Sequence, residues 1–158
     1  MDLHGNPITE TKVDEFRAAL PGCQIEFYTA ITIGGIEYST SLTELRVSYY
    51  DRHVITQNEA KDSYLGHLKY MTNLRSLKLD LNIDWSDEFI DINELSMLRD
   101  LESLKLTGIR IGNIGALRGL TNLRELSLWN TGINDLTAIV GLTNLVRTYE
   151  FGEVESVG

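Results

Sequence analysis

Residues that commonly carry out catalysis are few in this sequence, and they are scattered. His4, His53 and His67 lie in three different segments, and Cys23 is the single cysteine. An imidazole serves as a general base or metal ligand, and a thiolate as a nucleophile, only when suitable partners are near. The sequence has no G-x-x-x-x-G-K phosphate loop, no H-E-x-x-H and no G-x-S-x-G. We therefore predict no catalytic residue and no enzymatic activity.

Carboxylates that could bind a metal are concentrated in one stretch, at Asp84, Asp87, Glu88, Asp91 and Glu94. Their spacing does not follow that of a calcium-binding loop. A solvated outer face of a helix is the better interpretation. No metal and no other cofactor is expected.

Composition restricts the partners. The length of 158 residues fits one domain. The net charge of -9 and the pI near 4.7 mean that the chain repels nucleic acid and anionic membranes. No apolar run approaches the roughly 18 residues needed to span a bilayer. "MDLHGNPITE" does not read as a secretion signal. The localisation is left open: cytoplasmic as written, or the cell surface if the chain is a piece of a larger surface protein.

An internal repeat is the strongest feature of the sequence. The pattern L-x-x-L-x-L begins at Leu42, Leu74, Leu101, Leu123 and Leu145, with separations of 32, 27, 22 and 22 residues. The copy at Leu42 ends in Val47, and the last copy, "LVRTYE", decays. The pitch is regular toward the C-terminus and loosened by insertions before it.

The pattern predicts a stacked architecture. Alternation in L-x-L places both leucines on one face of a short strand, and apolar residues spaced about three apart supply a return path through short helical turns. One buried leucine contributes about 1.5 to 3 kcal/mol, which is too little for a single repeat to fold alone. Neighbouring repeats must therefore stack around a continuous core, with parallel strands on one side and turns on the other.

The residues from 72 to 145 resemble the leucine-rich repeat in the 22-residue form of bacterial internalin-like proteins, because pitch, strand pattern and "TNL" recur together. The resemblance implies an α/β solenoid with short parallel strands on the concave face, helices and turns on the convex face, and a small hairpin near the N-terminus. In this family an asparagine follows each strand and bonds to the adjoining turn. Asn6 and Asn82 match that place and Thr131 partly substitutes, but Ile109 departs from it, so we expect an irregular turn there.

A single domain over residues 1–158 is expected, divided into an irregular N-terminal repeat and hairpin (1–41), the repeats (42–145) and a C-terminal cap or tail (146–158). Val13, Phe16 and Leu20 predict a helix that stops at Pro21, and residues 30–39 predict a hairpin. Two more helices are expected over 56–71 and 86–98, the first with a capping box at Thr56. Phe89, Ile92 and Leu95 should face inward in the second, with Trp85 packed beneath it.

The strand register predicts which side chains face outward. The place between the two strand leucines holds Arg46, Lys78 and Lys105, which should form a basic row. The alternative is that acids such as Glu44 and Asp80 pair with this row as weak surface ion pairs. Trp129 follows Leu128 and should be exposed as an interface anchor, unless the tail folds back over it. The candidate partner-binding residues are Trp129, Lys105, Lys78, Arg46, Tyr28, Glu125 and Asp80.

Three functions remain open. The first is a protein-interaction module that binds another protein through its concave strand face. The second is a small acidic inhibitor that competes with DNA for the basic groove of a nucleic-acid-binding enzyme. The third is a structural spacer from a larger repeat protein, since the sequence opens inside the repeat-like "DLHGNP". An uncapped end would also allow two copies to pair.

Overall fold

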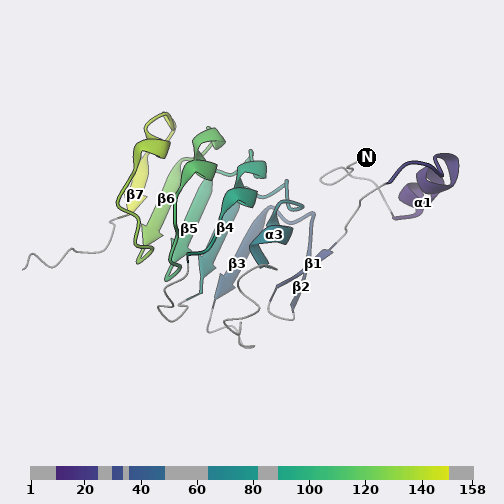
Figure 1. Cartoon of the computed structure of the whole chain (residues 1–158), viewed down its shortest axis with the longest axis horizontal. Helices are drawn as coiled ribbons and strands as arrows, with labels where there is room; N and C mark the ends of the chain where they lie inside the picture. The colour runs from purple at the N-terminus through teal and green to yellow at the C-terminus, as the bar shows by residue number, and fades with distance from the viewer. Residues whose placement is uncertain (1–9, 25–29, 34–35, 49–63, 82–88, 150–158) are drawn as a thin grey trace, which may run out of the picture.

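A five-stranded parallel sheet forms one side of the molecule. The computed structural model describes residues 10–24, 30–33, 36–48, 64–81 and 89–149. The sheet runs in the order β3 (Glu44–Ser48), β4 (Ser76–Asp80), β5 (Ser103–Thr107), β6 (Glu125–Trp129) and β7 (Arg147–Tyr149), as Figure 1 shows. Each strand therefore pairs with the strand of the next repeat, as stacking requires.

Alternation along the strands separates the core from the surface. Leu77 pairs with Leu104 and Leu104 with Leu126, and all three side chains are buried. The residues between the leucines point to the other side of the sheet, because successive side chains in a strand alternate. We call the outward side of strands β3 to β7 the strand face.

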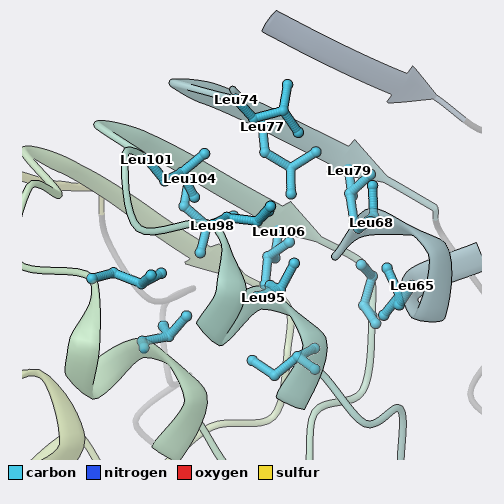
Figure 2. Close-up of a cluster of buried hydrophobic side chains, with 14 of the residues drawn as sticks. Leu65, Leu68, Leu74, Leu77, Leu79, Leu95, Leu98, Leu101, Leu104 and Leu106 are labelled. Atoms are coloured by element: carbon cyan, nitrogen blue, oxygen red, sulfur yellow. The ribbon is translucent and has the colours of Figure 1, made fainter. Parts of the chain in front are cut away.

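Short helical turns cover the inner side of the sheet: α3 (Tyr64–Leu68), η1 (Asn93–Met97), η2 (Gly115–Gly119) and η3 (Thr137–Ile139). Each sends leucine or isoleucine side chains toward the strands. Figure 2 shows Leu65, Leu68, Leu95 and Leu98 filling the layer between the turns and β4 and β5. The result is one continuous leucine core with the strands on its concave side and the turns on its convex side.

Polar side chains fix the turns at the same 22-residue interval. The carboxylate or amide oxygens of Asp91, Asn113 and Asp135 each accept a hydrogen bond from the backbone N–H two residues later, at 2.8, 2.9 and 2.8 Å. The asparagines of "TNL" link neighbouring repeats, since Asn122 and Asn144 donate to carbonyls 23 residues earlier at 3.1 and 2.8 Å. These bonds satisfy backbone groups that the short turns leave unpaired.

The turns after β5 and β6 begin alike but differ two residues later, where Gly132 (φ 71°) is left-handed and Arg110, its equivalent, is not. Gly108 (φ 64°) and Asn130 (φ 55°) occupy equivalent places in the left-handed region. The Thr131 hydroxyl donates to the Leu128 carbonyl at 2.9 Å, whereas Ile109 is fully buried in the core. At Ile109 apolar packing takes the place of the side-chain hydrogen bond that Thr131 makes, and the turn after β5 lacks the second left-handed residue of the turn after β6.

The N-terminal elements differ from the repeats. Helix α1 (Glu10–Ala19) lies apart from the sheet in Figure 1, with Val13 buried and Leu20 exposed just after its end. Strands β1 (Ala30–Ile33) and β2 (Ile36–Ser39) form the predicted antiparallel hairpin. Its Ile31 and Ile33 join the leucine core beside α3, so the hairpin covers this end of the solenoid.

One predicted helix needs correction, and another is described only in part. Phe89, expected to face inward, is 58% exposed, whereas Ile90 forms a parallel bridge with Ile111. Among residues 89–98 only the short turn η1 is helical, although Ile92 and Leu95 are buried as predicted. The helix expected over 56–71 is described only as α3. The capping box of that helix lies outside the described residues. So do Ser86 and Trp85 of the helix predicted over 86–98, and the asparagines Asn6 and Asn82. Within the part of the chain that is described, no helix is long and apolar enough to cross a membrane.

Candidate functional site

The outward positions of the strands form columns across the sheet. In the middle column the register places Arg46 beside Lys78, Lys78 beside Lys105 and Lys105 beside Ser127. Neighbouring strands lie about 4.8 Å apart, so the three cations follow one another closely. Ser127 is buried, and it ends the basic row at β6.

An open hollow of about 800 Å³ lies over the strand face, at the ends where the strands begin. Its lining includes five cationic side chains and three carboxylates, namely Arg46, Arg75, Lys78, Lys105, Arg124, Glu44, Glu102 and Glu125. The balance is positive within a chain whose net charge is -9. This hollow therefore has the opposite charge to the molecule as a whole.

Two of the carboxylates in the hollow are already paired. The Glu102 carboxylate accepts a hydrogen bond from the Arg75 guanidinium at 3.1 Å. Glu125 contacts Arg147 at 3.2 Å and Lys105 at 3.8 Å, and it accepts a hydrogen bond from the Ser103 hydroxyl at 3.3 Å. These groups remain partly exposed, so each pair adds at most about 1 kcal/mol to stability.

Three of the cations in the hollow are not paired in this way. Neither Arg46, Lys78 nor Arg124 forms an ion pair with any residue that the structure describes. Pairing of the basic row with Glu44 and Asp80, which the sequence suggested, is wrong for the described part of the chain. The acid that does meet the row is Glu125, and it lies beside Lys105, one strand further along.

Trp129 lies at the other end of the strands. Its side chain is 51% exposed, whereas the preceding Leu128 is 1% exposed, as alternation requires. It stands beside Thr107 on β5, and it is not among the residues that line the hollow. Asp80 occupies the same end of β4. Tyr28 and the tail from residue 150 lie outside the described residues.

Arg75, Glu102 and Arg124 were not predicted as site residues. Each follows the first leucine of its repeat, in "LRS", "LES" and "LRE", one place before the strand begins. The Glu102 N–H donates to the Arg75 carbonyl at 2.7 Å and the Arg124 N–H to the Glu102 carbonyl at 2.8 Å, which aligns these residues across repeats. The recurring charge at this place was the available signal.

A second hollow, of about 460 Å³, lies where the strands end and the turns begin, between Phe89 and residues 132–138. The guanidinium of Arg110 lies 4.6 Å from the centre of the Phe89 ring, and Phe89 rests on Gly112. Hydrogen bonds from the Thr137 hydroxyl and then its backbone N–H lower the pKa of nearby Asp135. Among the residues described, no group of three or more His, Cys, Asp or Glu could hold a metal ion.

Comparisons with known proteins bear on this architecture. No protein-family model and no curated protein matches the sequence. The solved structure of an internalin, InlF, from Listeria monocytogenes is 26% identical, with a TM-score of 0.56 over 87% of this chain and 35% of its own. Internalin C2 from the same organism is 25% identical, with a TM-score of 0.50 over 80% of this chain and 47% of its own. The chain thus spans less than half the length of either.

The repeating strand and turn, the shared leucine core and the charged strand face define a leucine-rich repeat solenoid. The likeness extends over most of the chain. The chain is an internalin-like leucine-rich repeat protein. At the general level this likeness supports a protein–protein interaction module, because solenoids of this kind offer an extended concave surface to partners.

Proposed function

We propose that the chain is a non-enzymatic protein-interaction module that binds its partner through the strand face. The observation that carries the proposal is the hollow over β3 to β6, where Arg46, Lys78 and Arg124 are unpaired with the described residues. The sheet beneath is held by a continuous leucine core, so these side chains stand on a rigid platform. A rigid surface loses little conformational entropy when it binds.

Trp129 supports the same face as an anchor. An indole that is 51% exposed leaves a large apolar area in water, and tryptophan is enriched among residues that dominate binding energy. It lies on β6, next to β5, which carries Lys105, and two strands from β4, which carries Lys78. A partner that covers the strand face would meet both the cations and the indole.

The two alternatives have less support. An inhibitor that imitates DNA needs a surface of closely spaced carboxylates, whereas the hollow has more cations than acids. A spacer needs no exposed tryptophan and no unpaired cations on its concave side. The interaction module accounts for both features.

Affinity capture from a native lysate tests the proposal. The bait variant combines Trp129→Ala, Lys78→Glu and Lys105→Glu. A matched variant, Val140→Ala with Arg99→Glu and Arg118→Glu, carries the same charge changes outside the hollow on exposed residues. A partner lost only by the first variant supports binding through the strand face. A partner lost only by the second would contradict it.

Pairing of two copies through the C-terminal end is a second candidate interaction. Leu117 and Leu123 are fully buried, whereas Ile139 and Leu145, 22 residues later, are only partly buried, and Val146 is 76% exposed. A second copy could cover this apolar end by an isologous contact. Light scattering on wild type and Val146→Lys tests it: a dimer dissociated by the variant is expected, and a wild type that is monomeric at high concentration would contradict it.

A further inference from the structure

We infer that the hollow on the strand face takes an acidic peptide segment of the partner. This inference rests on the proposed function and specifies the chemistry of what that face binds. The segment would place separate carboxylates against Arg46, Lys78 and Arg124, the cations without an ion pair among the described residues. Guanidinium groups suit this role, because they bind carboxylates through two parallel hydrogen bonds.

The arrangement of the cations fits an extended chain that crosses the strands. Arg46 and Lys78 are direct neighbours on β3 and β4, and Arg124 lies beyond β5, just before β6. Lys105, which lies between them, already forms an ion pair with Glu125. The cations without an ion pair among the described residues therefore lie at two places that flank the Lys105–Glu125 pair, which calls for carboxylates separated by uncharged residues.

The three acids of the hollow favour a peptide over a polyanion. Glu44, Glu102 and Glu125 lie on the same lining as the cations, so a nucleic acid or a sulfated glycan, with charge at every unit, would be repelled by them. The net charge of -9 adds a long-range penalty for any dense polyanion. A peptide can leave uncharged residues, or a lysine, opposite these carboxylates.

Fluorescence anisotropy on the full chain tests the inference, with a labelled peptide of glutamates alternating with glycine and serine as the probe. Wild type should bind it, more weakly as salt rises. Lys78→Glu and Arg124→Glu should each weaken binding by about tenfold. Arg99→Glu makes the same charge change on an exposed residue outside the hollow, and it should alter binding by less than about twofold. Unchanged thermal unfolding of the three variants would show that they fold.

Each other outcome overturns the inference. Equal losses in all three variants would mean that net charge alone attracts the probe. If heparin or a DNA oligonucleotide binds more tightly than the glutamate peptide, the hollow binds a different class of ligand. If wild type does not bind the probe but the strand-face variant still loses a captured partner, the acidic class is wrong and the proposed binding face stands.

Discussion

Strands β4 and β5 differ from β6 only on one side. All three have leucine at both inward positions, and these leucines are almost completely buried. At the outward positions, β4 reads Ser, Lys, Asp and β5 reads Ser, Lys, Thr, whereas β6 reads Glu, Ser, Trp. Packing constrains the inward positions, and the outward ones vary from repeat to repeat. If the strand face binds the partner as proposed, specificity comes from these outward residues, which packing does not constrain.

The largest expected effect contrasts two adjacent residues of β5. Leu104→Ala should lower the free energy of unfolding by about 2 to 5 kcal/mol, because the Leu104 side chain is fully buried and its removal leaves a cavity in the core. Lys105→Ala, one place along, should change it by less than about 1 kcal/mol, since its pair with Glu125 is partly exposed. Urea unfolding followed by circular dichroism gives both values. Similar losses at both positions would contradict the inward and outward assignment.

Trp129→Ala should weaken binding of a strand-face partner by about 2 kcal/mol, the size typical of an aromatic anchor. Thr107→Ala, at the same place on the neighbouring strand, should change it by less than about 0.5 kcal/mol. Calorimetric titration with the captured partner measures both. Equal effects of the two substitutions would remove the distinction between β5 and β6.

The turn after β6 should show a smaller effect. Asn130→Ala places an alanine at φ 55° and should cost about 1 kcal/mol of stability, because a Cβ atom crowds the left-handed conformation. Asn130→Gly should cost little, since Gly108 fills the equivalent place after β5. The difference in thermal midpoint between the two variants checks this. If Asn130→Gly is the less stable, another interaction of Asn130 is what stabilises the turn.

The smallest expected effect is a pH dependence at Asp135. Its pKa is lowered in the folded chain by hydrogen bonds from Thr137, so the ionised form contributes stability above its ordinary value of 3.8, and this is lost as the pH falls through the lowered value. Asp135→Asn keeps an acceptor, as Asn113 does one repeat earlier. Its thermal midpoint should therefore fall less than that of wild type between about pH 5 and pH 3. A steeper fall of the thermal midpoint in the variant than in wild type would contradict the stabilising role of ionised Asp135.

Much of the fold was predictable, because two periods coincide. Alternation within each strand and the recurrence of L-x-x-L-x-L, first after 27 residues and then after 22, fix the register, which is why Lys78 and Lys105 could be aligned from the sequence. Phe89, Ile92 and Leu95 also have a helical spacing, but Ile90 pairs with Ile111, and this tertiary contact turns Phe89 outward. A local pattern does not reveal such a pairing.

The hollow was only half predictable. The alternation of the strands led to Arg46, Lys78 and Lys105, but Arg75 and Arg124 lie before the strands, where alternation does not apply. Their alignment depends on backbone hydrogen bonds between successive repeats. Which cations are paired is also a matter of side-chain reach, since Glu125 contacts Lys105 whereas Glu44 meets no described cation.

Site-specific photo-crosslinking tests most directly whether the partner contacts the strand face. A photoreactive residue in place of Ser76 stands in the hollow, and one in place of Ser96 stands on the exposed side of η1. Irradiation with the captured partner should give a crosslinked product from position 76 and none from position 96. A product from position 96 alone would contradict binding through the strand face and place the contact on the helical turns.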